Sequence, residues 1–169
     1  MRIMNKKLVL ASVFVLLLVA IGYTAFTGFF SFNGSQTVTT ISPTAIGDRA
    51  VVARVIDGDT IELTDGMRVR LIGIDTTEKG EKCYKEGKDR LKELVEGKDV
   101  ILEKDLTDKD RYGRLLRYVY VNDTFVNLLL AREGLAKMYT IKPDVKYQKQ
   151  IEEAFLLARN ENGCIWKSS

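Results

Sequence analysis

The stretch RVIDGDTIEL, residues 54–63, places two short β-type runs on either side of a small acidic turn. The β-branched and alternating flanks predict the two strands of a hairpin, because such residues fit a pleated, half-buried surface. Asp57 and Gly58 have the chemistry of a tight turn, since aspartate bonds the local backbone and glycine takes a positive φ without strain. Asp59 starts the second run, where Asp is a poor strand former. The turn therefore explains Asp57 but leaves Asp59 in need of a functional reason.

The rest of the pattern is a run of short strands followed by helices. Strand-type runs lie at residues 51–56, 60–63, 68–74, 100–103 and 115–121. Apolar residues at helical spacing predict three helices, at residues 81–96, 126–132 and 147–160. Five short strands with a helix after the third predict an α+β fold, a small closed OB-type barrel capped by helices.

The first part of the chain lies outside this pattern. Basic residues at positions 2, 6 and 7 precede roughly two dozen uncharged residues, long enough to cross a bilayer as a helix. Residues 1–30 are therefore predicted to be a signal peptide or a membrane anchor. We favour a retained anchor, because the apolar run continues past the small-residue site at 20–22 to Phe30.

The next segment, residues 31–47, carries Ser, Thr, Asn and Gly without a charge and is predicted to be a flexible linker. Residues 48–169 then form the folded domain. A basic flank before the apolar run keeps that end inside, so the domain is expected outside the cell, either on the membrane or secreted.

The two cysteines, Cys83 and Cys164, fit a translocated domain. Their spacing makes neither a CxxC redox pair nor a metal cluster, and thiols in an oxidising compartment form disulfides. We predict that they pair and close a loop of about 80 residues. The alternative is two buried, unpaired cysteines that act as small hydrophobes.

The composition of the 169-residue chain removes several kinds of chemistry. It contains no histidine, which excludes His-based acid–base catalysis and His-containing zinc sites. Its formal net charge of +3 is too small for a general polycation effect to account for nucleic-acid binding. Any such function must rest on local sites, with acid–base work done by Asp, Glu, Lys or Tyr.

Two carboxylates are candidates for a metal site. Asp59 opens the second predicted strand and Asp75 ends the third, and neighbouring strand ends in a small barrel meet at one rim. Two close carboxylates repel each other unless a cation lies between them. Oxygen ligands without histidine or thiolate indicate a hard cation, Ca²⁺ or Mg²⁺. The site is short of protein ligands, which suits catalysis better than structure.

Three more side chains are candidates for phosphate chemistry. Glu78, three residues beyond Asp75, is placed to polarise a water molecule as a general base; the alternative is a solvated loop glutamate. Arg70 and Arg114 offer planar guanidinium forks that match phosphate oxygens. The alternative for each arginine is a surface ion pair, because residues 105–114 are dense in charges of both signs.

Four motifs occur in an order that carries a family resemblance: IDGDT (56–60), RVRLIGIDTTE (68–78), DRYGR (110–114) and VNLLLAREGLAK (126–137). Together they closely resemble the staphylococcal nuclease, or thermonuclease-like, family over about residues 51–166. The resemblance implies Ca²⁺ as the ion, held by Asp59, Asp75 and the backbone carbonyl of Thr76.

The resemblance also implies roles for the other candidates. Glu78 would be the general base, and Arg70 and Arg114 would bind the scissile phosphate, with Arg114 also aiding departure of the leaving group. Further residues would bind substrate: Arg111 and Tyr112 at a terminal phosphate, and Tyr139, unless it packs in the core, against a base. One departure is Thr77, where family members usually carry proline, so the loop loses a fixed φ.

The expected protein is thus an extracellular, Ca²⁺-dependent nuclease without sequence preference. It would hydrolyse phosphodiester bonds of single-stranded or frayed DNA and RNA, leave 3'-phosphate ends, and act as a monomer. One alternative is a catalytically weak module that only binds nucleic acid, which the presence of all the acidic and arginine positions disfavours. Another is a surface domain in which Ca²⁺ only rigidifies the barrel, which leaves the two arginines unexplained.

Overall fold

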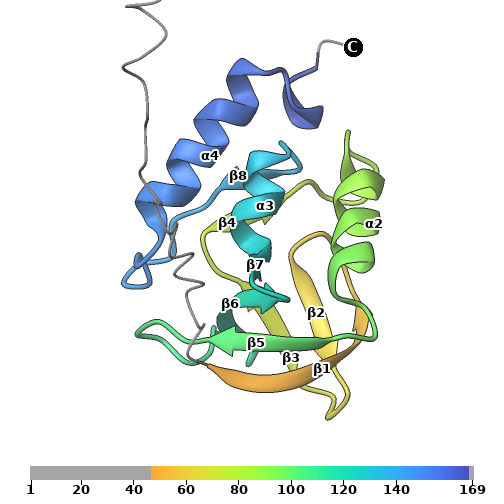
Figure 1. Cartoon of the computed structure of the whole chain (residues 1–169), viewed down its shortest axis with the longest axis vertical. Helices are drawn as coiled ribbons and strands as arrows, with labels where there is room; N and C mark the ends of the chain where they lie inside the picture. The colour runs from red at the N-terminus through yellow and green to blue at the C-terminus, as the bar shows by residue number, and fades with distance from the viewer. Residues whose placement is uncertain (1–46, 168–169) are drawn as a thin grey trace, which may run out of the picture. The chain divides into compact units, whose positions relative to one another are not determined.

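The computed structural model describes residues 47–167 (Figure 1). The predicted signal or anchor segment and all of the predicted linker except Gly47 lie outside these residues. Of the helices between residues 47 and 167, none has both the length and the apolar character that spanning a bilayer requires.

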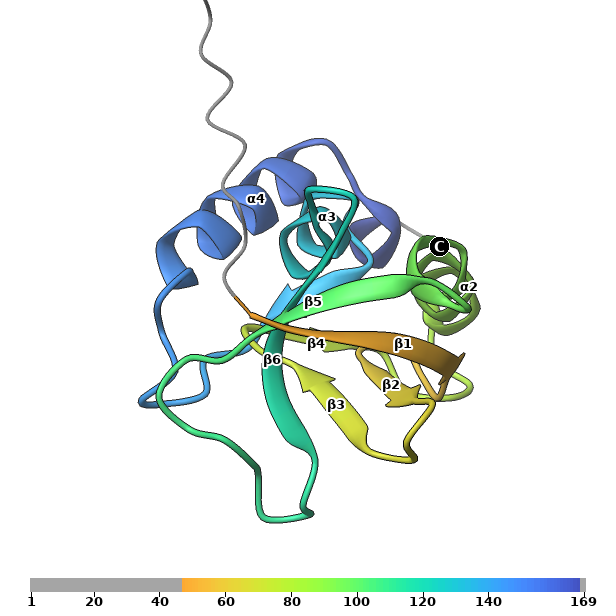
Figure 2. The same ribbon diagram turned by 60° about the horizontal axis from the view of Figure 1, so that its bottom comes forward.

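Five strands form a closed barrel, as the sequence predicts. They are β1 (Asp48–Val55), β2 (Thr60–Leu63), β3 (Arg68–Leu71), β5 (Asp99–Glu103) and β6 (Leu115–Val121). Neighbours in the order β3-β2-β1-β5-β6 pair antiparallel, and the barrel closes through a parallel pairing of β3 with β6. Figure 2 shows the strands curving around this barrel with the helices on one side. The arrangement is an OB-type α+β fold.

The predicted third strand, residues 68–74, is in fact two strands. The strand is interrupted at Gly73, whose φ of +84° lies in the left-handed region. After this residue the chain continues as β4 (Ile74–Thr76). β4 leaves the barrel and pairs antiparallel with β8 (Ala136–Met138). A further two-residue strand, β7 (Thr124–Phe125), pairs with β6. The break sets Asp75 and Thr76 on a separate ribbon beside the barrel rim.

Three helices cover the barrel, α2 (Tyr84–Val95), α3 (Val126–Arg132) and α4 (Gln148–Asn160), and a 3₁₀ turn, η1 (Cys164–Trp166), follows. The bounds of α3 match the prediction. α2 begins at Tyr84 rather than Glu81, because Cys83 takes a left-handed φ of 66° that does not continue a helix. The structure joins Cys83 and Cys164 in a disulfide, the pairing that the sequence favours over two free thiols.

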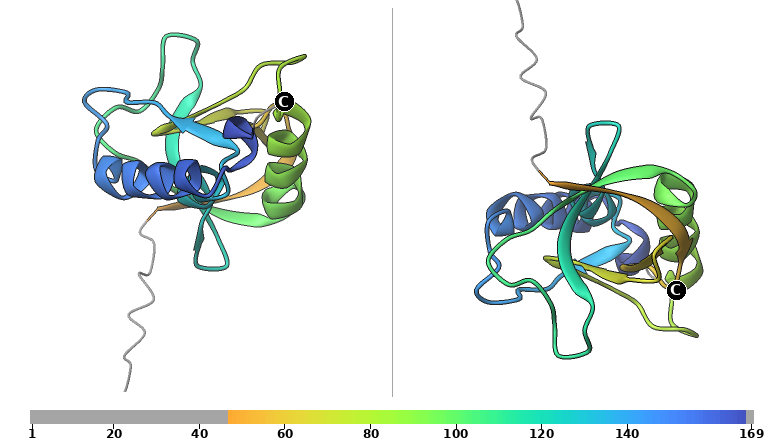
Figure 3. Two further views of the ribbon diagram at one scale, coloured as in Figure 1. Left: turned by 90° about the horizontal axis from the view of Figure 1, so that it is seen from above. Right: turned by 90° about the horizontal axis from the view of Figure 1, so that it is seen from below.

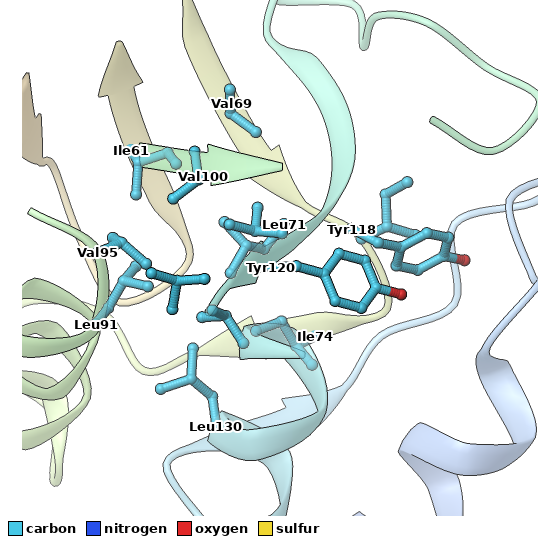
Figure 4. Packing of buried hydrophobic residues seen from close by; sticks show 14 of the residues in the cluster. Ile61, Val69, Leu71, Ile74, Leu91, Val95, Val100, Tyr118, Tyr120 and Leu130 are labelled. Atoms are coloured by element: carbon cyan, nitrogen blue, oxygen red, sulfur yellow. The ribbon is translucent and has the colours of Figure 1, made fainter. Parts of the chain in front are cut away.

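The core lies inside the barrel and under the helices. Figure 4 shows Leu71 of β3, Leu91 of α2 and Leu130 of α3 in one apolar cluster, and all three side chains are fully buried. One polar residue in the core, Asn127, is also fully buried. Its amide accepts the N–H of Val119 at 2.9 Å and donates to the carbonyl of Ile72 at 2.9 Å. Asn127 therefore ties α3 to the point where β3 gives way to β4.

Candidate active site

A cavity of about 660 Å³ opens at the rim of the barrel. We call it the central cavity; it is lined by Asp57, Asp59, Arg70, Asp75, Thr76, Thr77, Glu78, Asp110, Arg111, Tyr112, Arg114, Leu116, Tyr139 and Ile141. Figure 3 shows two of the contributing segments, the β5–β6 loop and the stretch after β4, on the same side of the barrel in both views. Every residue that the sequence predicts to bind the metal, to take part in catalysis or to bind the substrate lines the central cavity.

Arg70 joins the two predicted metal ligands. Its Nη2 atom lies 3.1 Å from Oδ2 of Asp59 and 2.8 Å from Oδ1 of Asp75. Its Nη1 atom donates to the carbonyls of Leu71 and Ile74, at 2.8 and 2.7 Å. The guanidinium thus spans the break between β3 and β4 and fixes both carboxylates. With only 8% of its side chain exposed, Arg70 is not the surface ion pair of the alternative interpretation.

Asp59 is the more enclosed of the two carboxylates. It is buried, and burial raises its pKa to about 6, although Arg70 and a hydrogen bond from the Thr76 N–H act in the opposite direction. Its Oδ2 accepts that N–H at 3.0 Å and the Thr76 hydroxyl at 3.2 Å. A buried carboxylate whose charge is incompletely compensated favours a further positive charge beside it.

The acidic turn between β1 and β2 differs in part from the prediction. Asp57 makes the turn as expected, because its Oδ1 accepts the N–H of Asp59 at 3.2 Å. Gly58, however, is not among the glycines with a left-handed φ. A Cβ at Gly58 would lie 2.7 Å from the Thr76 hydroxyl oxygen. Glycine is needed here for the close approach of β4 to the turn, and not for an unusual φ.

Arg114 reaches the same site through two residues that the sequence analysis missed. Its Nε donates to Oδ2 of Asp110 at 2.7 Å, and its Nη1 lies 3.4 Å from the Thr60 hydroxyl. That hydroxyl in turn donates to Oδ1 of Asp59 at 3.0 Å. The spacing of four residues between Asp110 and Arg114, across the tight turn at Gly113 (φ +80°), was the available signal for the pair. Thr60 gave no signal beyond its place after Asp59.

The predicted substrate residues lie on the outer wall of the cavity. Tyr112 is 68% exposed and Tyr139 is 52% exposed. The core-packing alternative for Tyr139 is therefore wrong. Arg111 donates from Nη2 to the Tyr112 hydroxyl at 2.7 Å, and its guanidinium carbon lies 4.8 Å from the centre of that ring. Two exposed aromatic rings and an exposed guanidinium group suit a nucleotide with its base and phosphate.

Glu78 is exposed at the mouth of the central cavity. Its backbone N–H donates to Oε2 of Glu81 at 2.9 Å, and its carbonyl accepts the N–H of Glu81 at 2.9 Å. This compact turn holds the backbone of Glu78, while no hydrogen bond within residues 47–167 holds its carboxylate. A carboxylate of this kind is available to bind water or an ion.

The hydroxyl group of Thr77 destabilises the loop after β4. Its hydroxyl is buried and has no hydrogen-bond partner within residues 47–167. We expect Thr77→Val, which replaces the hydroxyl with a methyl group of similar size, to raise the free energy of unfolding by about 1 kcal/mol. Thr77→Pro should raise the free energy of unfolding by about 0.4–1 kcal/mol, because proline restricts the unfolded chain. The residue before a proline favours an extended backbone, and Thr76 already has one as part of β4. Denaturant unfolding of the two variants separates these effects, and a Thr77→Val protein no more stable than the parent contradicts the first.

The oxygen atoms at the rim fit a hard cation. Two carboxylates, Asp59 and Asp75, converge on one guanidinium nitrogen, and Thr76 follows Asp75 on β4 and also lines the cavity. Within residues 47–167 no group of three or more His, Cys, Asp or Glu side chains is placed to hold a metal. The donor set is therefore small and all oxygen, which suits an ion such as Ca²⁺ that also takes water and substrate oxygens.

Comparison with known proteins agrees with this geometry. The family model for staphylococcal nuclease homologues matches residues 68–168. The chain is 40% identical over 126 residues to the thermonuclease of Staphylococcus hyicus, covering 69% of this chain and 75% of that protein. It is 38% identical over 144 residues to the thermonuclease of Staphylococcus intermedius, covering 80% and 86%. Endonuclease YncB of Bacillus subtilis is 39% identical over 127 residues, covering 69% and 60%. The chain belongs to the staphylococcal nuclease homologue family.

Proposed function

We propose that this chain is a nuclease that uses Ca²⁺ to hydrolyse phosphodiester bonds of single-stranded or frayed DNA and RNA. The observation that carries the proposal is the convergence of two carboxylates, two arginines and Glu78 on one cavity. The thermonucleases and endonuclease to which the chain is similar support the same activity.

The two arginines supply the charge that phosphate hydrolysis needs. Both arginines are paired with carboxylates in the structure. Arg70 pairs with Asp59 and Asp75, and Arg114 pairs with Asp110. A bound phosphate would compete for the same guanidinium donors, which bind phosphate oxygens as a fork. Once a phosphate has replaced these carboxylates, the two guanidinium groups would stabilise the negative charge that develops on the phosphoryl oxygens.

Glu78 and Arg114 act on opposite ends of the reacting bond in this proposal. The Glu78 carboxylate takes a proton from a water molecule as its oxygen attacks phosphorus. The bond from phosphorus to the 5'-oxygen breaks, and Arg114 stabilises the departing oxygen. The phosphate stays on the 3'-oxygen of the upstream nucleotide. Ca²⁺, held by Asp59, Asp75 and the Thr76 carbonyl, would supply further charge neutralisation when bound.

The cavity wall also supports a lack of sequence preference. Guanidinium groups recognise phosphates, and aromatic faces such as those of Tyr112 and Tyr139 stack on any base. The location outside the cell is likewise a proposal. The disulfide between Cys83 and Cys164 supports it, because such bonds form and persist in oxidising compartments.

The test is release of acid-soluble nucleotides from heat-denatured DNA by the full-length chain, with millimolar Ca²⁺, with Mg²⁺ and with EGTA. We expect rapid release with Ca²⁺ and a loss of at least 100-fold with EGTA, because the two rim carboxylates then lack their ion. Folded protein that binds the DNA without cutting it would favour a binding module. Protein that Ca²⁺ stabilises but that neither binds nor cuts would favour a structural role for the ion.

A further inference from the structure

A second hollow adjoins the central cavity and extends beyond the predicted site. It has a volume of about 540 Å³ and is lined by Gly66, Met67, Arg68, Tyr112, Gly113 and Arg114. We call it the outer groove. It lies between the β2–β3 turn and the β5–β6 loop, and it shares Tyr112 and Arg114 with the central cavity. A nucleic-acid strand that left the central cavity past Tyr112 would therefore enter the outer groove.

Arg68 lines this groove, and its guanidinium group is only weakly paired. Its side chain is 55% exposed, and its one ion pair among residues 47–167 is a long contact of 3.4 Å from Nε to Glu62. Glu62 is already bound by both Nε and Nη2 of Arg54, at 2.8 and 2.9 Å. The hydrogen bond from Arg54 is also the main cause that lowers the pKa of Glu62. No hydrogen bond joins the two Nη atoms of Arg68 to another residue of the described domain.

The strand places Arg68 in register with the reaction centre. Arg68 and Arg70 are alternate residues of β3, so both side chains leave the same face of the strand, about 6.6 Å apart along it. Arg70 points to the carboxylates of the central cavity, and Arg68 lines the outer groove. Two guanidinium groups at this spacing suit different phosphates of one extended strand.

The groove also offers apolar contacts for a base. Met67 is 44% exposed and Tyr112 is 68% exposed, and both line the groove beside Arg68. The Tyr112 ring is oriented by the Arg111 hydrogen bond to its hydroxyl and by two guanidinium groups, whose carbons lie 4.8 and 5.5 Å from its centre. An exposed sulfur-containing side chain and a fixed ring are surfaces on which any base packs.

We propose that the outer groove binds a nucleotide that flanks the one in the central cavity, with its phosphate on Arg68 and its base against Met67 and Tyr112. This inference rests on the proposed nuclease function and adds a subsite to it. It predicts that the enzyme prefers strands long enough to reach the groove, and that Arg68 serves only those substrates.

The experiment compares Arg68→Ala with Arg54→Ala on a dinucleotide and on a ten-nucleotide single strand. Arg54 is the matched control, because it contacts the same glutamate but does not line the groove. For Arg68→Ala we expect kcat/KM on the longer strand to fall about fivefold or more. The log–log salt dependence should weaken by about 0.7, the value for one phosphate contact on a single strand. The dinucleotide rate and both rates of Arg54→Ala should stay near wild type.

An equal loss on both substrates would overturn the inference, because Arg68 would then act through the fold or the central cavity. So would an unchanged rate on the longer strand. If the wild-type chain cuts neither substrate, the proposed function fails by itself. Equilibrium binding of the labelled ten-nucleotide strand then decides the groove: weaker binding by Arg68→Ala than by Arg54→Ala supports it, and equal binding refutes it.

Discussion

Replacing Glu78 with glutamine should lower the rate of DNA hydrolysis by about 100- to 10,000-fold, the usual contribution of a general base. The amide keeps the shape of the carboxylate but does not take a proton from water at neutral pH. Because Glu78 is exposed and no hydrogen bond within residues 47–167 involves its side chain, the fold should be unaffected. Single-turnover rates on denatured DNA, with thermal melting of both proteins, provide the measurement.

A matched control separates this effect from a general loss of negative charge. Glu86 is an exposed glutamate in the first turn of α2 and does not line the central cavity. Glu86→Gln should therefore cut at the wild-type rate. A Glu78→Gln protein that retains more than about one tenth of the wild-type rate contradicts the general-base role. The carboxylate would then serve only to orient water or to bind cations at the cavity mouth.

The barrel could be predicted from the sequence because its strands carry their own signals. β6, with the apolar run LLRYVYV, has the predicted bounds. Asp65 and Gly66, between β2 and β3, also have the sequence of a tight turn, and Gly66 takes the left-handed φ that such a turn favours. β4 and β8 could not be predicted, since each has three residues and periodicity needs longer runs. The sequence around Gly73 also predicts one continuous strand, because the β-branched residues Ile72 and Ile74 stand on either side of it.

The site residues could be predicted more fully than the contacts between them. Asp59 could be singled out from its own position, because Asp is a poor strand former at the start of a strand-type run. Arg70 is selected through the family resemblance, since a surface ion pair is the alternative. Their partners give weaker signals, because Thr60 is an ordinary strand residue and Asp110 stands in a loop rich in charge. The true reason for Gly58 depends on the distance to Thr76, which lies on another strand. Contacts of this kind come from the tertiary fold and leave no local pattern.

The disulfide holds together two parts of the domain that are distant in sequence. Cys83 and Cys164 are 81 residues apart, and they join the start of α2 to η1. η1 also packs closely on the turn after α3, where the Ile165 N–H donates to the carbonyl of Gly134 at 3.2 Å. A Cβ on Gly134 would lie 2.7 Å from the Cα of Gly163, so the two backbones are in direct contact. The bridge thus adds to a docked C-terminal turn instead of replacing one.

Replacing both cysteines with serine should lower the free energy of unfolding by roughly 4 kcal/mol, because the bridge no longer restricts a loop of this length in the unfolded chain. Guanidinium unfolding of the oxidised wild type and of the Cys83→Ser/Cys164→Ser protein measures the difference. A thiol reductant should destabilise the wild type to a similar extent and leave the double variant unchanged, which rules out a packing defect caused by serine. Equal stability of the oxidised and reduced wild-type proteins would show that the C-terminal turn is held by its backbone contacts alone. Since the segment from Glu78 to Cys83 leads directly into the bridge, the reduced protein should also lose activity at a lower temperature than the oxidised one.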